Sequence, residues 1–289
     1  MLEAHSSYHP CAFCLALKKA CLCRNIDAVT GNVRVCTGAN DSSLCNRMMS
    51  EKTDTPILFL DFDGTISERD AVDLILENYA APAWLEREEA WRTGHIGSRE
   101  CLRTQIDLVR AMPDELNDLL DTIRVDEGLL PLLETCAAHN VPVHIISDGF
   151  DRCIQRLLAR ASPPKLATLL RRVRVFSSHL EFAGQARWRT SFSFFPQTCG
   201  HNCATCKPAL MQALNERNAP TIFVGDGLSD KYAAACADLV FAKKSLANYC
   251  RENSVPYIPY DTLHDVAAYL ATLLRSNSNL QRRAIRDCA

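Results

Sequence analysis

The residues of this chain that could do chemistry are two short acidic motifs, one serine and one lysine. Asp61 and Asp63 stand two positions apart, and Asp226 and Asp230 belong to a second acidic motif further along. Carboxylates about 4 Å apart repel by about 4 kcal/mol at an effective dielectric near 20, so such a cluster needs a cation. Oxygen ligands with open positions suit Mg²⁺, which keeps bound waters and also binds substrate phosphate.

The serine and the lysine add groups that bind anions. Ser147 follows an apolar run, and Lys207 is followed by Pro208 and the helical stretch 209–214. Proline is favoured at the first position of a helix, which places Lys207 at a helix N-terminus, where anions bind. The hydroxyl and the ammonium group are therefore expected to bind phosphoryl oxygens and to offset the charge that repels an attacking carboxylate.

These residues follow the strands of a predicted sheet. Apolar runs at 57–60, 141–146 and 221–224 each end in the polar residues above, and weaker candidates lie at 172–176, 239–241 and 256–258. Strands that alternate with helices predict an α/β fold, a Rossmann-like parallel sheet with right-handed crossovers. Ligands bind beyond the carboxyl ends of such strands, so we expect the polar residues to meet at one edge of the sheet.

A helical segment separates the first two strands. Apolar residues recur at i, i+3, i+4 and i+7 in two places, Val72 to Tyr79 and Leu116 to Ile123, which is the period of an amphipathic helix. We predict an inserted all-helical cap at 68–128, a catalytic core made of 54–67 and 129–276, and a polar tail at 277–289.

Taken in order, the motifs resemble those of the haloacid dehalogenase superfamily. The segment 61–66 looks like its first motif, and Ser147, Lys207 and the segment 225–230 match its second, third and fourth. The resemblance implies a phosphoric monoester hydrolase in which Asp61 is the nucleophile and forms an aspartyl-phosphate. Asp63 would protonate the leaving oxygen and later activate water.

The same resemblance implies the binding roles. Substrate would be bound by Thr65, Ser147, Gly149 and Lys207. Mg²⁺ would be held by Asp61, the backbone carbonyl of Asp63 and Asp226, with Asp230 in support.

Two further features bear on the substrate, a small phosphomonoester. The helical cap is similar to the phosphoserine-phosphatase-like branch, and segments 199–207 and 257–266 look like those of the methionine-salvage phosphatases that act on 2-hydroxy-3-keto-5-methylthiopentenyl-1-phosphate. Gln105 stands where phosphoserine phosphatases carry an arginine that grips the substrate carboxylate, and an amide binds a carboxylate more weakly. We expect that compound or a relative. A phosphoserine or broad sugar-phosphate phosphatase is the alternative, with Arg99 or Arg103 supplying the charge.

The chain holds 15 cysteines. Cys199, Cys203 and Cys206 have the spacing CxxxCxxC just before Lys207, and three interpretations stay open. The thiols could shape the loop without a metal, or bind a structural Zn²⁺ with His201 as fourth ligand. They could also hold an iron–sulfur cluster of the kind found in radical enzymes, although no barrel is patterned here.

The first 53 residues differ from the rest, with six cysteines among small polar residues and poor apolar periodicity. We predict a disordered extension. The alternative from another functional class is a metal-binding or interaction protein, in which this extension is the working part and the α/β domain is vestigial. The intact acidic motifs argue against this alternative.

The net charge and the hydropathy of the chain bear on its binding partners and on its location in the cell. The net charge of −2 gives no sign of nucleic-acid binding. No apolar run approaches the roughly 18 residues that a membrane span needs. The first residues lack the pattern of a secretory signal, so we expect a cytoplasmic protein.

Overall fold

The computed structural model describes residues 24–26, 33–35, 55–161 and 163–287. The chain divides into two units, Met1–Glu51 and Lys52–Ala289. In the first unit, β1 (Arg24–Ile26) and β2 (Val33–Val35) pair antiparallel. The predicted disordered extension falls largely outside the described residues, and so do its six cysteines.

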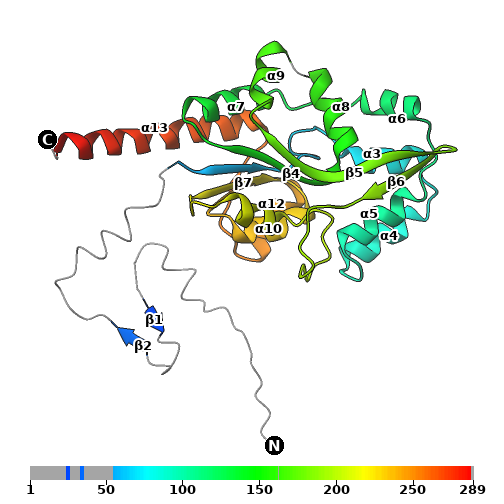
Figure 1. Cartoon of the computed structure of the whole chain (residues 1–289), viewed down its shortest axis with the longest axis horizontal. Helices are drawn as coiled ribbons and strands as arrows, with labels where there is room; N and C mark the ends of the chain where they lie inside the picture. Colours follow the sequence, from blue (N-terminus) through cyan, green and yellow to red (C-terminus); the bar gives the residue numbers. More distant parts are fainter. Residues whose placement is uncertain (1–23, 27–32, 36–54, 162, 288–289) are drawn as a thin grey trace, which may run out of the picture. The chain divides into compact units, whose positions relative to one another are not determined.

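The second unit is built on a seven-stranded sheet with the order β6-β5-β4-β3-β7-β8-β9 (Figure 1). The neighbouring strands are parallel except for β5 and β6, which pair antiparallel. The predicted α/β fold is confirmed, with one antiparallel edge strand that we did not predict. The strands are β3 (Ile57–Leu60), β4 (Val143–Phe150), β5 (Arg174–Gly184), β6 (Arg187–Ser191), β7 (Thr221–Gly225), β8 (Leu239–Ala242) and β9 (Ile258–Pro259).

Helices cover both faces of this sheet, which explains why its central strand is apolar throughout. In β3, Leu58 and Leu60 pack into one core cluster, and Ile57 and Phe59 pack into the other. Figure 1 shows α7, α8 and α13 on one face and α10 and α12 on the other. The core helices are α7 (Leu129–Ala138), α8 (Asp151–Ala161), α9 (Pro164–Leu170), α10 (Lys207–Leu214), η1 (Leu228–Asp230), α11 (Lys231–Cys236), α12 (Lys244–Glu252) and α13 (Leu263–Asp287).

The last helix, α13, extends beyond the predicted catalytic core. The backbone of α13 stays helical to Asp287, past residue 276, where the predicted polar tail begins. In the part of the chain that the structure describes, no helix is both long and apolar enough to cross a membrane.

Strand β4 runs further than the predicted 141–146. It continues through Ser147, Asp148 and Gly149 to Phe150, and its pairing with β5 shifts register between Ile146 and Phe150. Within this irregular stretch, the backbone N–H of Gly149 donates to Ser147 Oγ at 2.9 Å. This irregular end of the strand presents the Ser147 side chain at the edge of the sheet.

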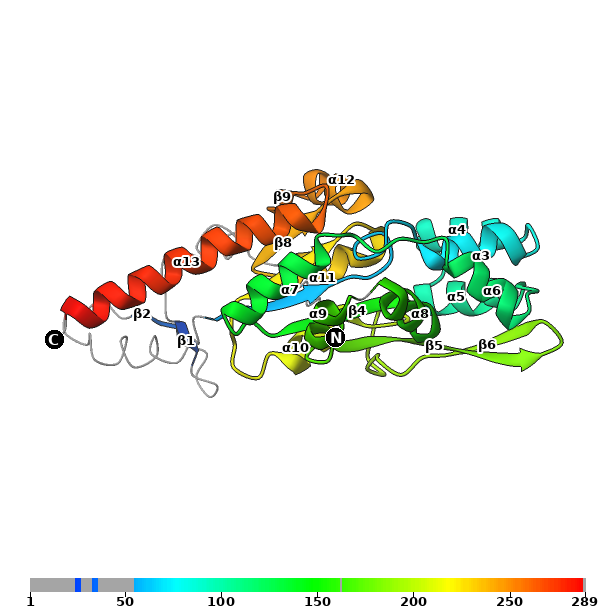
Figure 2. The same cartoon turned by 90° about the horizontal axis from the view of Figure 1, so that it is seen from above.

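The segment 68–128 carries the helices α3 (Ala71–Tyr79), α4 (Trp84–Arg92), α5 (Ser98–Ile106) and α6 (Pro113–Leu120). The β5–β6 hairpin extends alongside them (Figure 2). The backbone N–H of Ala111 donates to Ala186 O at 3.0 Å, and Trp188 Nε1 donates to Ala111 O at 2.9 Å. The hairpin therefore packs against the helical segment, while the domain limits stay a prediction.

Candidate active site

The predicted carboxylates meet at the carboxyl edge of the sheet. Asp61 directly follows β3 and Asp226 directly follows the neighbouring strand β7, while Asp230 ends the short helix η1. Carboxylate oxygens of these three residues all lie within 4.8 Å of one another, and all three side chains are buried. Residues far apart in the sequence thus form one acidic cluster.

Lys207 lies inside this cluster, at the start of α10. Its Nζ is 2.6 Å from Asp61 Oδ1 and 2.5 Å from Asp230 Oδ1, and only 2% of its side chain is exposed. Burial by itself lowers the pKa of this lysine, but the carboxylates of Asp230 and Asp61 outweigh burial and raise it. The ammonium group is therefore charged at any physiological pH.

Asp230 also shapes the loop after β7. Its Oδ2 accepts the backbone N–H groups of Asp226 at 3.1 Å and of Gly227 at 3.2 Å. A Cβ on Gly225 would lie only 2.3 Å from that oxygen, so glycine is required for this close approach. Asp230 thereby holds Asp226 in position.

The cluster fits a hard divalent cation. Burial raises the pKa of Asp61 well above its ordinary value, and the charges of Asp230 and Asp226 raise it further. Lys244 Nζ reaches Asp226 Oδ2 at 2.9 Å, but its side chain is half-exposed and screened by water. Oxygen donors with surplus negative charge suit Mg²⁺, and no soft sulfur ligand takes part in this acidic cluster of described residues.

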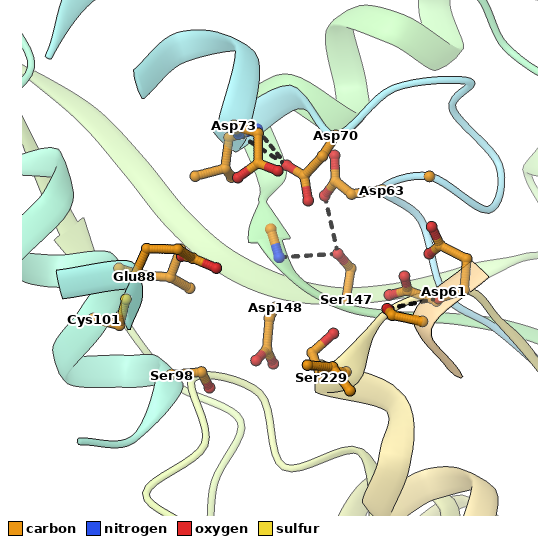
Figure 3. Close-up of a pocket in the computed structure, with 18 of the residues that line it drawn as sticks. Asp61, Asp63, Asp70, Asp73, Glu88, Ser98, Cys101, Ser147, Asp148 and Ser229 are labelled. Carbon is orange, nitrogen blue, oxygen red and sulfur yellow. Dashed lines mark hydrogen bonds between the residues drawn. The ribbon is translucent and has the colours of Figure 1, made fainter. Parts of the chain in front are cut away.

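Asp63 points away from this cluster, toward Ser147. Its Oδ1 accepts the N–H of Ala71 at 2.9 Å, and Ser147 Oγ donates to its Oδ2 at 3.5 Å (Figure 3). The predicted binding of Mg²⁺ by the Asp63 backbone carbonyl stays a prediction. Burial raises the pKa of Asp63 well above its ordinary value, and the Asp70 carboxylate adds to this. This raised pKa favours the protonated form of the carboxyl group.

A cavity of about 560 Å³ opens between this edge of the sheet and the helices α3, α4 and α5. Asp61, Asp63, Ser147, Gly149 and Asp226 line its floor. Its far end includes Asp73, Glu88, Trp91, Leu102 and Gln105, three of which are acidic or amide side chains (Figure 3 labels Asp73 and Glu88).

Two predicted substrate-binding residues do not line this cavity. Thr65 is fully buried, and its Oγ1 donates to Asp226 Oδ1 at 3.3 Å. Lys207 is bonded to Asp61 and Asp230 behind the cavity wall. Both residues therefore contact the acidic cluster in this structure, whereas Ser147 and Gly149 line the cavity. The substrate-binding role of all four residues stays a prediction.

Gln105, which stands where phosphoserine phosphatases carry an arginine, lines the far end of the cavity. It is buried, and its Nε2 donates to Glu88 Oε2 at 3.1 Å. The two arginines considered as substitutes lie elsewhere. The Arg99 guanidinium stacks over the Phe195 ring at 3.5 Å, and Arg103 is exposed and outside the cavity lining.

Comparison with known proteins decides the family. A family model described as haloacid dehalogenase-like hydrolase matches residues 58–235. The chain belongs to this family. The resemblance predicted from four motifs is therefore confirmed.

Two related proteins of known name illustrate the similarity. The 2-hydroxy-3-keto-5-methylthiopentenyl-1-phosphate phosphatases of Geobacillus thermodenitrificans (strain NG80-2) and Bacillus mycoides (strain KBAB4) are 29% and 28% identical to this chain. The alignments span 219 and 225 residues, and each covers 75% of this chain and 96% of the relative.

Solved structures share the fold at lower identity. A substrate-bound phosphoserine phosphatase complex has a TM-score of 0.55 and 16% identity, and the match covers 75% of this chain and 99% of that one. The HAD family hydrolase t0658 of Salmonella enterica serovar Typhi has a TM-score of 0.55 and 18% identity, with coverage of 86% and 89%. These likenesses support the haloacid dehalogenase-like fold alone.

Sequence reasoning missed three residues of this haloacid dehalogenase-like site. Lys244 contacts Asp226 and also Gly64 O at 3.3 Å. Asp70 caps α3, and burial raises its pKa to about 7. Asp148 Oδ1 accepts the N–H of Thr205 at 2.9 Å. The signal for Lys244 was present in the sequence, since it follows a predicted strand just as Asp61 and Asp226 do.

The predicted cysteine group is only partly assembled. Sγ atoms of Cys199, Cys203 and Cys206 lie within 4.8 Å of one another. His201, the predicted fourth member, is not in this group. Its ring instead stacks on the ring of Tyr232 in α11, with 3.7 Å between the two centroids.

Proposed function

We propose that this chain is a Mg²⁺-dependent phosphomonoesterase that acts through an aspartyl-phosphate at Asp61. The observation that carries the proposal is the position of Asp61. It lines the cavity beside Asp63 while Lys207, buried behind it, bonds to its carboxylate. A carboxylate needs such a cationic partner to approach a negatively charged phosphoryl group. Family membership and the names of the relatives support the same reaction class.

The chemistry has two halves. In the first, an Asp61 oxygen bonds to phosphorus, the bond from phosphorus to the leaving oxygen breaks, and Asp63 gives its proton to that oxygen. In the second, Asp63 takes a proton from water, the water oxygen bonds to phosphorus, and Asp61 is released with inorganic phosphate. The raised pKa of Asp63 suits the proton donor of the first half.

The remaining residues bind and compensate charge. Ser147 Oγ faces the cavity and donates to a phosphoryl oxygen, while Lys207 offsets the negative charge at Asp61. Asp61, Asp226 and the backbone carbonyl of Asp63 would hold Mg²⁺, which would neutralise negative charge during phosphoryl transfer.

The far end of the cavity favours a substrate without a carboxylate. Asp73 and Glu88 are acidic, and Gln105 is already bonded to Glu88. Two arginines also line the cavity, but Arg69 pairs with Glu77 at 3.3 Å and Arg92 is exposed. A substrate carboxylate would therefore mainly meet like charges at the far end. We therefore propose 2-hydroxy-3-keto-5-methylthiopentenyl-1-phosphate, which carries hydroxyl, keto and methylthio groups, as the first candidate, ahead of phosphoserine.

A panel of phosphomonoesters tests this proposal. With Mg²⁺, kcat/KM for the methylthio compound is expected to exceed that for phosphoserine by at least about tenfold, since an unpaired buried charge costs more than about 1.4 kcal/mol. A chelator or Asp226→Ala should remove activity with every substrate. A preference for phosphoserine would refute the substrate, and full activity in the chelated protein would refute the metal.

Gly149→Ala tests the placement of Asp63. The added Cβ would lie 2.1 Å from Asp63 Oδ2 and 3.1 Å from Ser147 Oγ, so the Asp63 carboxyl must move. A misplacement of about 1 Å can cost on the order of a hundredfold, and we expect a loss of kcat of that order with an unchanged fold by circular dichroism. Gly200→Ala is the control, because no atom lies within 4 Å of its added Cβ. Equal rates in the two variants would contradict the role of Asp63.

A further inference from the structure

Three thiols gather in the loop that leads into Lys207. The Sγ atoms of Cys199, Cys203 and Cys206 lie within 4.8 Å of one another, and none of these residues is in a disulfide. Cys203 and Cys206 are buried, and Cys199 is partly exposed. Ligands about 2.3 Å from a tetrahedral Zn²⁺ stand roughly 3.8 Å apart, which this spacing accommodates with small adjustments.

The backbone holds the loop that carries these thiols. Cys199 N donates to Pro196 O at 3.0 Å, Asn202 N donates to Cys199 O at 3.3 Å, and Cys206 N donates to Phe194 O at 2.7 Å. The three sulfur atoms are therefore kept close together on an ordered loop. A cation that binds sulfur would displace the thiol protons and coordinate all three atoms at once.

We propose that Cys199, Cys203 and Cys206 bind one Zn²⁺, with a water molecule in the fourth position, and that this ion holds Lys207 and the helical segment in register. The acidic cluster beside Asp61 does not compete for it. Thiolates select soft cations such as Zn²⁺, whereas carboxylate oxygens select Mg²⁺. The two sites therefore take different metals from the same solution.

The loop's contacts explain why a metal here would matter. Toward α5, Ala204 N donates to Ser98 Oγ at 2.9 Å and Arg99 N donates to Asn202 O at 3.2 Å. Toward the sheet, Thr205 N donates to Asp148 Oδ1 at 2.9 Å. Cys206 is also the residue directly before Lys207. A change in this loop therefore reaches the start of α5, the end of β4 and the buried ammonium group together.

Metal content of the full-length, untagged chain tests the binding. After dialysis against a chelator and reloading with Zn²⁺, Cys203→Ser and Cys206→Ser are each expected to hold one equivalent less than the wild type. Cys250→Ser, which replaces a fully buried thiol elsewhere in the core, should hold as much as the wild type. The test compares the zinc content of the variants with that of the wild type rather than absolute zinc contents, because the first 53 residues contain six further cysteines that also offer sulfur ligands.

Cobalt gives a second readout. Co²⁺ bound by thiolates produces a sulfur-to-metal charge-transfer band. The intensity of this band should fall in Cys203→Ser by the contribution of one bound Co²⁺, and it should not fall in Cys250→Ser. Equal zinc in all variants, or a disulfide among the three residues in the freshly purified wild type, would overturn the metal site.

The effect on Lys207 rests on the proposed phosphatase function and is measured separately. Zinc-free Cys203→Ser should lose on the order of tenfold to a hundredfold in kcat, while phosphate is still trapped on Asp61. An unchanged kcat and melting temperature would overturn the positioning role. Asp61→Asn should keep its full zinc content whether or not the chain is a phosphatase, so failure of one proposal is distinguishable from failure of the other.

Discussion

Replacing Asp61 with asparagine is expected to reduce turnover by at least about a thousandfold, because an amide cannot form the acyl-phosphate. The side chains are nearly equal in size, and the amide oxygen can still accept the Lys207 hydrogen bond, so the fold should remain. Steady-state rates measure the loss. Brief reaction with radiolabelled substrate, followed by acid quenching and peptide mapping, should place the label on Asp61 in the wild type and nowhere in the variant.

Asp114→Asn is the matched control for this change, since Asp114 is an exposed aspartate on α6 and lies outside the cavity lining. Its rate should equal that of the wild type. Retention of more than a few per cent of wild-type activity in Asp61→Asn, or a label on another residue, would contradict the nucleophile.

Replacing Lys207 with methionine is expected to lower both activity and stability. Two buried carboxylates, Asp61 and Asp230, would lose the ammonium group that lies 2.6 Å and 2.5 Å from them. Removing one partner of a buried ion pair typically costs about 3–5 kcal/mol of unfolding free energy, and turnover should fall at least about a hundredfold. Urea unfolding without metal at neutral pH measures the first effect.

The pH dependence of this loss has a defined sign. Burial already raises the pKa values of Asp61 and Asp230 in the folded wild type, and removal of the lysine raises them further. A carboxyl group whose pKa is raised by folding destabilises the fold at pH values above its unfolded pKa, and this penalty decreases as pH falls toward the unfolded pKa. The difference between variant and wild type should therefore shrink as pH falls from 7 toward 5.

Lys165→Met is the control for this experiment. Lys165 forms a surface ion pair with Glu134 and is 70% exposed, so its loss should cost no more than about 1 kcal/mol at any pH. A stability loss in Lys207→Met that is equally small, or that grows as pH falls, would contradict the charge balance described for the cluster.

The positions of the candidate catalytic residues in the fold were predictable because their signals are local. Asp61 and Asp226 each follow a short apolar strand, and Lys207 precedes a proline at a helix start. Parallel strands place their carboxyl ends at one edge, so local strand signals suffice to bring the residues together. The family resemblance uses the same residues.

The β5–β6 hairpin lacked such a local signal. Gln185 and Ala186 form its turn at φ values of 52° and 57°, a conformation that usually requires glycine or asparagine. The predicted strand 172–176 accordingly stopped short of Gly184. Packing of Trp188 against Ala111 supports the hairpin, and no pattern within either segment announces that contact.

The sequence alone determined which residues end the buried strands of this protein and which lysine begins a helix. Those residues in turn indicate the family. Only the tertiary structure decided what surrounds them. It placed His201 on Tyr232 rather than with the cysteines, bonded Gln105 to Glu88 and brought Lys244 to Asp226. The physical reason is the separation in sequence between the residues that interact. Strand ends and helix starts are set by neighbours in sequence, whereas partners of buried polar groups are chosen among side chains that only folding brings within hydrogen-bond distance.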